Sequence, residues 1–179
     1  MNKKTIIEKY NRGEDLSFVY FWKTKSPFSN WYPVPFKDEV IDYWCTEQYM
    51  MAQKALLFKD LDTYHRIMSS KDQRNIKNLG RQVRGFDQEI WDKNKISIVI
   101  RGNFLKFQQN YSLRRILLDT KDKILVEASP YDCIWGVGLA EEDEQIKNPN
   151  NWRGENLLGE ALMEVREQLK KDKSYEKFI

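Results

Sequence analysis

Histidine and cysteine are scarce in this chain, and their scarcity excludes several kinds of active site. The 179 residues include one histidine, His65, and two cysteines, Cys45 and Cys133. Such a set cannot supply a zinc site rich in His or Cys, and it contains no disulfide framework. A Ser-His-Asp triad or a Cys-His dyad would have to use His65, whose polar neighbours in residues 62–66 predict an exposed helical surface.

Phosphate-binding glycine motifs and long apolar runs are missing as well. The sequence has neither G-x-x-x-x-G-K-[ST] nor G-x-G-x-x-G. Catalysis would then depend on carboxylates, lysines and aromatic rings, which favours glycosyl or Schiff-base chemistry over metal hydrolysis and phosphoryl transfer. No run approaches the ~20 apolar residues of a membrane span, and no signal peptide is visible. We therefore expect a cytoplasmic protein with no cofactor, no metal and no membrane partner.

Charged and aromatic residues are abundant. Charged residues make up 32% of the chain, but the net charge is only +3 and Lys and Arg are spread along its length, which is weak support for polyanion binding. The basic tail at residues 170–173 is typical of a solvated helix end. The six Trp, nine Tyr and nine Phe are more informative, because several lie in polar, loop-like segments where a ring could face a planar ligand.

The residue patterns predict one α+β domain covering residues 1–179. Strands are expected at 17–22, 40–44 and 124–128, and a proline-rich loop at 26–36. Helices are expected at 46–58, 60–69, 73–83, 87–108 and 157–169, with a short helix opened by Ser112. Thr46, Asp87 and Asn156 are the predicted N-caps. Many helices, a small sheet and no βαβ alternation together indicate the α+β class.

Two segments carry carboxylates in settings suited to catalysis. Glu47 and Lys54 share one face of the predicted helix, about 10 Å apart along its axis, so both could reach one ligand. The alternative is that Met50 and Met51 on that face are core residues flanked by the charges. After the strand at 124–128, a loop carries Asp132, Trp135, Gly136 and Gly138. Its glycines would let a phosphate approach backbone N–H groups, unless the segment is a structural turn with a packed Trp.

Other segments contain residue types suited to ligand binding. Phe28, Ser29, Asn30 and Trp31 lie in the proline-bounded loop and could stack on a base and bind its edge, although a packed loop would look the same. Arg81 and Lys106 are candidate phosphate contacts, with surface ion pairing as the alternative for each.

The ordered set of these segments resembles the NADAR superfamily, which includes the YbiA-like N-glycosidases. The resemblance covers about residues 18–170 and implies a compact, helix-rich YbiA-like fold. One departure is Gln48, where many relatives have His, so a proton shuttle at this position is not expected. The matching residues are Phe28-Ser29-Asn30, Thr46-Glu47, Gln53-Lys54-Ala55, Gly80-Arg81, Trp91, Lys106-Phe107, Gln109-Asn110, Glu127-Ala128-Ser129, Asp132, Trp135-Gly136-Val137-Gly138, Trp152, Gly154, Asn156-Leu157-Leu158-Gly159, Leu162-Met163 and Arg166.

The resemblance implies an enzyme that breaks a ribose C1′–N bond. Some members cleave phosphoribosylamino pyrimidines of riboflavin synthesis, and others remove ADP-ribose from modified guanine. The implied substrate contains ribose phosphate or ADP-ribose, and ADP-ribosylated DNA or RNA is a candidate partner. The alternative is a non-catalytic module that binds ADP-ribose or NAD. By position, the implied catalytic residues are Glu47, Lys54, Trp91, Asp132 and Trp135.

Overall fold

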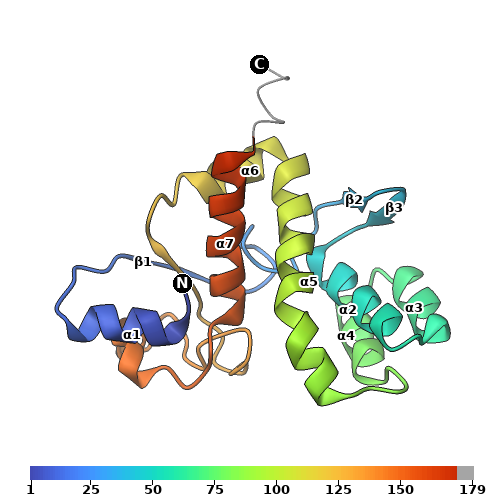
Figure 1. Cartoon of the computed structure of the whole chain (residues 1–179), viewed down its shortest axis with the longest axis horizontal. Helices are drawn as coiled ribbons and strands as arrows, with labels where there is room; N and C mark the ends of the chain where they lie inside the picture. Colours follow the sequence, from blue (N-terminus) through green and yellow to red (C-terminus); the bar gives the residue numbers. More distant parts are fainter. Residues whose placement is uncertain (173–179) are drawn as a thin grey trace. The chain divides into compact units, whose positions relative to one another are not determined.

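The computed structural model describes residues 1–172, and the end of the predicted basic tail, Lys173, lies outside them. The chain divides into two compact units. The terminal unit combines Met1–Ser29 with the chain from Tyr111 onward, and the central unit is Asn30–Asn110. Seven α-helices, two short 3₁₀ helices and two small sheets make up the described part, which confirms the helix-rich α+β class (Figure 1).

The terminal unit is organised around a parallel pair of strands. In β1 (Phe18–Phe21) and β4 (Ile124–Glu127), Phe18 lies opposite Ile124 and Phe21 lies opposite Glu127. Helix α7 (Leu157–Lys171) packs against β4 with its predicted apolar face, and all four residues of that face are buried, namely Leu158, Leu162, Val165 and Leu169. The unit also contains α1 (Lys3–Asn11), α6 (Tyr111–Leu118), η1 (Glu144–Lys147) and η2 (Pro149–Asn151).

The central unit is four helices and a hairpin. β2 (Phe36–Asp38) pairs antiparallel with β3 (Ile41–Tyr43). Helix α2 (Thr46–Leu57) contacts α3 (Leu61–Met68), α4 (Gln73–Arg81) and α5 (Gln88–Gln109), so it forms the centre of this unit. Gly102 of α5 lets Tyr49 of α2 pack closely, because a Cβ at position 102 would lie 2.6 Å from the ring. The core cluster includes Tyr43, Tyr49, Ile67, Ile76 and Leu105.

Most predicted elements are confirmed, and the exceptions have local causes. Helix α1 was missed because it is largely polar, with Ile6 as its one buried residue. The sheet residues form two sheets instead of one, and β2 was missed because it is three residues long and follows Pro35. The N-cap predicted at Thr46 is wrong, because Thr46 is already helical. Cys45 is extended and its Sγ accepts from the Gln48 N–H, whereas the cap predicted at Asp87 is confirmed.

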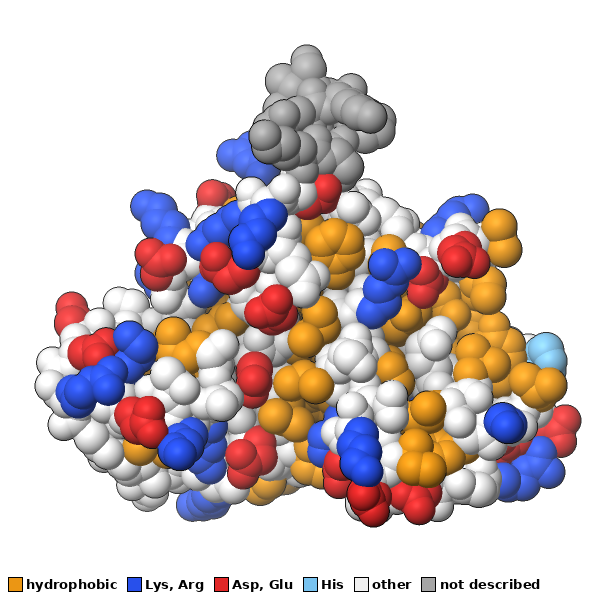
Figure 2. Space-filling view, viewed as in Figure 1, with side chains coloured by type: hydrophobic (Ala, Val, Ile, Leu, Met, Phe, Trp, Pro, Cys, Tyr) orange, Lys and Arg blue, Asp and Glu red, His pale blue; other side chains and the backbone are white. Residues whose placement is uncertain are grey.

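The surface is mixed in charge. On the face shown in Figure 2, Lys and Arg side chains are interspersed with Asp and Glu, with hydrophobic side chains between them. From residue 1 to residue 172, no helix has the length and apolarity needed to span a bilayer.

Candidate active site

Glu47 lies at the start of α2, next to the loop that contains Asn30. The Glu47 N–H donates to the Asn30 carbonyl at 2.9 Å, and the Asn30 side-chain oxygen accepts from the Asn103 amide of α5 at 3.0 Å. All three residues are buried. A carboxylate in the first turn of a helix is also stabilised by the helix dipole. The Asn30 segment therefore fixes the backbone that carries the predicted catalytic acid.

Lys54, two turns later on α2, has an aromatic environment. Its Nζ donates to the Gly80 carbonyl at 2.8 Å, and it lies 4.2 Å from the Phe86 ring centroid and 5.4 Å from that of Trp91. Partial burial lowers the pKa of Lys54, because desolvation disfavours the ammonium form. The structure thus brings together the predicted Lys54 and Trp91. It adds Phe86, which sequence reasoning missed, because an aromatic residue after Gly85 in a helix connection does not show which lysine it contacts.

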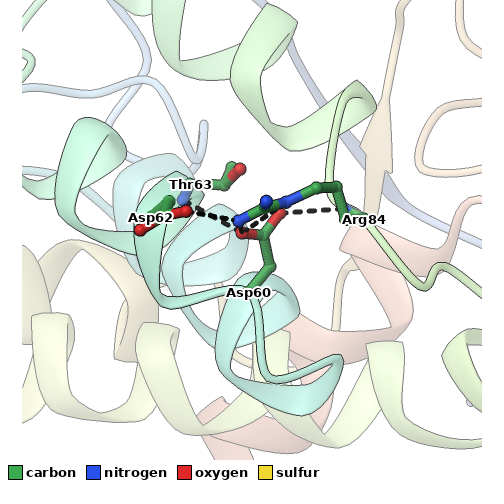
Figure 3. A network of polar contacts seen from close by, with 4 residues as sticks. All are labelled: Asp60, Asp62, Thr63 and Arg84. Atoms are coloured by element: carbon green, nitrogen blue, oxygen red, sulfur yellow. Dashed lines mark hydrogen bonds and ion pairs between the residues drawn. The ribbon is translucent and has the colours of Figure 1, made fainter.

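An ion-pair network holds the connection that carries Phe86 (Figure 3). The buried Asp60 carboxylate accepts from the Arg84 backbone N–H at 2.8 Å and from the Arg84 guanidinium at 2.7 Å, and it also accepts from the Thr63 N–H at 3.2 Å. Arg84 pairs with Asp62 as well, at 2.6 Å. The hydrogen bonds from Arg84 hold the pKa of Asp60 well below its usual range. This network ties the α4–α5 connection to the start of α3, two residues before Phe86.

The two predicted phosphate contacts in the central unit differ in accessibility. Lys106 of α5 is fully buried, near the rings of Tyr32 and Phe107, and desolvation lowers its pKa to about 7. It is therefore not a surface ion-pair partner, the second role that the sequence leaves open. Arg81 lies exposed in the last turn of α4, directly after Gly80.

In the terminal unit, the loop carrying Asp132 and Trp135 is held by backbone hydrogen bonds. One oxygen of the Asp132 carboxylate accepts from the N–H groups of Ile134 at 2.9 Å and of Trp135 at 2.8 Å. The carbonyls of the loop accept from the N–H groups that precede and begin α7. These bonds run from Glu155 to Cys133, from Leu157 to Ile134, from Leu158 to Trp135 and from Asn156 to Gly136, over 3.0–3.2 Å. The loop backbone therefore caps α7.

Asn156 is the N-cap residue of α7, as predicted, but its side chain does not supply the cap hydrogen bond. Its backbone has a left-handed conformation, with φ 58°. Its amide instead donates to the Leu125 carbonyl at 2.9 Å and accepts from the Glu127 N–H at 3.0 Å. Strand β1 pairs with one edge of β4. The Asn156 side chain therefore supplies the hydrogen-bond partners of two backbone groups on the other edge, which has no neighbouring strand.

The glycines of this region allow close packing. A Cβ on Gly136 would lie 3.0 Å from the carbonyl oxygens of Glu127 and Asp132, and Gly138 has φ +71°. A Cβ on Gly154 would overlap the Gly136 carbonyl oxygen. These contacts give each glycine a packing reason to lack a side chain. Phosphate binding by Gly136 and Gly138 stays a prediction.

The remaining predicted residues belong to both units. In the terminal unit, Phe28 is buried with its ring 5.6 Å from that of Phe21, and Ser29 is buried beside it. In the central unit, the Trp31 carbonyl accepts from Gln73 at 3.0 Å. Within residues 1–172, no group of three or more His, Cys, Asp or Glu side chains could hold a metal ion.

Residues 20–170 match the NADAR domain. The chain belongs to the NADAR family. The mimivirus protein N-glycosidase R617 from Acanthamoeba polyphaga mimivirus is 50% identical over 79% of this chain and 86% of its own length. The chloroplastic riboflavin biosynthesis protein PYRR of Zea mays is 31% identical over 86% of this chain, which spans 25% of that protein.

A solved NADAR-type structure confirms the predicted fold. The NMR structure of the E. coli protein YbiA superposes with a TM-score of 0.71 and 28% identity, covering 87% of this chain and 86% of YbiA. Several relatives that the chain matches over most of their length are named N-glycosidases, among them R617, Npun_R5314 and YbiA. The resemblance inferred from the ordered motifs is thus confirmed, and this NADAR chain is an enzyme that hydrolyses an N-glycosyl bond.

Proposed function

We propose that the chain hydrolyses the bond between ribose C1′ and a base nitrogen in a phosphoribosylated or ADP-ribosylated substrate. The observation that carries the proposal is the environment of Lys54, an amine held between a carbonyl oxygen and two aromatic rings. Rings of this kind suit a planar base, and an amine of lowered pKa suits reaction at an anomeric carbon. Since the chain is an enzyme, the alternative of a module that only binds ADP-ribose or NAD is set aside.

The two carboxylates have complementary tasks in this reaction. Cleaving a C1′–N bond builds positive charge on the ribose and negative charge on the departing base. One carboxylate stabilises the ribose cation, and the other gives a proton to the base. We assign these tasks jointly to Glu47 and Asp132. Two N–H groups fix the orientation of the Asp132 carboxylate, which favours an electrostatic role for it.

Lys54 acts in this proposal as a nucleophile. Its neutral amine bonds to C1′ while the C1′–N bond breaks and the base departs with the proton from the general acid. The C1′–O4′ bond then breaks as a proton moves from the new ammonium to O4′, so that the open-chain sugar is bound to Lys54 as a protonated Schiff base. Water then adds to C1′, releasing the sugar aldehyde and restoring the amine. Partial burial favours this chemistry, because the lowered pKa raises the fraction of neutral amine. The stacking partners in the proposal are Trp91, Phe86 and Trp135.

Borohydride trapping tests the Schiff base. Reduction during turnover is expected to leave a stable sugar adduct on Lys54, seen by intact-mass and peptide mass spectrometry. The matched variant Lys54→Arg keeps the positive charge but has no nucleophilic amine, so it should give no adduct. If no adduct forms with the wild type and Lys54→Ala remains active, the nucleophilic role is wrong.

Mass spectrometry of the released base tests the reaction itself. Wild type and Glu47→Gln are compared on a phosphoribosylamino pyrimidine, which the similarity to PYRR favours, and on ADP-ribosylated guanine. The wild type should release free base from at least one of them, and Glu47→Gln should reduce kcat by about 10²-fold or more. If Asp132→Asn in the Glu47→Gln background costs as much as it does in the wild type, the two acids act independently and the joint assignment fails.

A further inference from the structure

Of the two aromatic rings that contact the Lys54 amine, Phe86 is the nearer and the more exposed. Its centroid lies 4.2 Å from Nζ, against 5.4 Å for Trp91. Phe86 is 41% exposed, whereas Trp91 is 8% exposed. Burial within α5 fixes the Trp91 ring. The Phe86 ring belongs to the connection between α4 and α5, residues 82–87, so its position over the amine depends on what holds that connection.

The α4–α5 connection consists of turn and irregular structure, and contacts to other segments give it its shape. Its ends are fixed, because Val83 is buried and the Asp87 carboxylate accepts from the Ile90 N–H as the cap of α5. Directly before Phe86, Gly85 has φ +69°, and glycine adopts many other conformations as readily. The contacts of the preceding residue, Arg84, therefore decide where the Phe86 ring lies.

The turn that ends the Lys54 helix holds this part of the connection. Phe58, directly after α2, donates its N–H to the Lys54 carbonyl at 3.3 Å and packs its ring 5.3 Å from that of Phe86. Asp60, two residues later, accepts two hydrogen bonds from the Arg84 guanidinium, at 2.7 and 3.2 Å, and one from the Arg84 N–H, at 2.8 Å (Figure 3). The Asp60 side chain is 1% exposed. Charge-assisted hydrogen bonds to a buried carboxylate hold a segment more firmly than an exposed ion pair does.

The charge state of Lys54 depends on how much water reaches its amine. Burial lowers the pKa of Lys54, and within residues 1–172 no charged neighbour adds to this effect. A vacancy in place of the Phe86 ring would admit water and raise the pKa toward its usual value. The charged residues closest in sequence to the amine and its contacts are Glu47 on α2, Arg81 on α4, Arg84 and Asp87 in the connection, and Asp92 on α5.

We propose that Arg84 is a positioning residue, whose ion pair with Asp60 holds Phe86 over the Lys54 amine and keeps water from that side of it. This rests on the proposed function, which gives the amine its task in the reaction. Arg84 acts through Phe86 and does not contact the reacting atoms. The ion pair then serves the site as well as the stability of the central unit.

The pH dependence of Lys54 acetylation tests the proposal without any substrate. The full chain is treated with trace acetic anhydride at a series of pH values, and acetylated Lys54 is quantified by peptide mass spectrometry. Arg84→Gln should raise the midpoint by about one pH unit, which leaves about tenfold less neutral amine at pH 7. The matched control Arg101→Gln removes another exposed arginine of the same unit, paired with Asp38 at 2.8 Å, and should match the wild type.

Two further variants separate the effect of Phe86 from that of charge and of folding. Arg84→Lys keeps a cation beside Asp60, so it should fold like the wild type and raise the midpoint less than Arg84→Gln. Phe86→Ala should raise the midpoint by itself, because alanine admits water where a leucine would exclude it. Adding Arg84→Gln to Phe86→Ala should then change the midpoint little. Circular dichroism confirms that each variant is folded.

Two results would overturn the proposal. The first is an unchanged midpoint in both Arg84 variants. The second is an equal shift from Arg84→Gln with and without Phe86, because Arg84 would then act on the amine as a nearby charge. Kinetics test the proposed function separately, since the limb on which kcat/KM rises with pH should follow the acetylation midpoint. A limb that stays in place while the midpoint moves would refute Lys54 as the nucleophile and still confirm that Arg84 holds Phe86.

Discussion

Replacing Asn156 by Ala should destabilise the terminal unit strongly. The Asn156 amide completes the free edge of β4 by donating to the Leu125 carbonyl and accepting from the Glu127 N–H. Asn156 is 1% exposed, so water does not readily replace its amide. Alanine would leave both backbone groups without their present partner, in a backbone conformation with φ 58° that alanine adopts poorly.

The magnitude follows from these two losses. Each buried backbone group left without a hydrogen bond costs about 1–3 kcal/mol, and the left-handed conformation adds about 1 kcal/mol for a residue with a Cβ. The expected loss is therefore about 3–7 kcal/mol, a large part of the ~5–15 kcal/mol that stabilises a typical domain. Asn156→Gly should be about 1 kcal/mol less destabilised than Asn156→Ala, because glycine tolerates positive φ.

Urea unfolding measures the effect, followed by circular dichroism and by tryptophan fluorescence. With a slope of about 2 kcal/mol per molar urea, Asn156→Ala should lower the midpoint by about 2 M. Asn156→Asp serves as a third variant, since it keeps an acceptor for Glu127 but places a carboxylate oxygen against the Leu125 carbonyl. It should be at least as unstable as Asn156→Ala. A loss under 1 kcal/mol in the alanine variant would refute the assignment of Asn156 as the edge partner of β4.

Three further substitutions test other parts of the structure. Gly154→Ala should lower kcat about tenfold in steady-state assays, because its Cβ displaces the Asp132 loop. Gly13→Ala should lower stability, because Gly13 has φ +76°, but it should leave kcat unchanged, since a Cβ there meets nothing within 4 Å. Phe86→Leu should shift to lower pH the limb of the pH–rate profile on which activity rises with pH. The Lys54 ammonium loses its aromatic partner, which lowers the pKa of Lys54 further. Burial lowers the pKa of Lys106 to about 7 in the folded protein. Between pH 7 and about 10 this lysine is therefore protonated in the unfolded chain but mostly neutral in the folded protein. Urea titrations should therefore show wild-type stability rising with pH in that window, and Lys106→Met should remove the rise.

The sequence predicts best the helices whose buried apolar residues recur at helical spacing. Helix α7 turns one apolar face to β4, so its spacing of apolar residues is diagnostic. Helix α1 has a single buried residue and leaves no such pattern. The α2 cap was misplaced by one residue because Thr is the commoner cap, whereas here the extended backbone of Cys45 decides the boundary.

The sequence predicts which types of residue form the site, but not how they are arranged in space. Lys54 and Trp91 could be proposed from ordered motifs, and the structure brings them together in the central unit. Phe86 could not be connected to Lys54, because its position depends on Asp60 and Arg84, which lie 24 residues apart in the chain. Likewise, Asn156 looks like a helix cap in sequence, and only the free edge of β4 shows why its amide is needed elsewhere.

The parallel pairing of β1 with β4 has a consequence for how the protein is made. Phe18 and its partner Ile124 are separated by the whole central unit, so the first strand leaves the ribosome long before its neighbour exists. At ~5–20 residues per second, that interval is on the order of 5–20 s. The central unit has time to form its own core first. The segment that carries β1 must wait, with a strand edge open to wrong partners, until β4 has been synthesised.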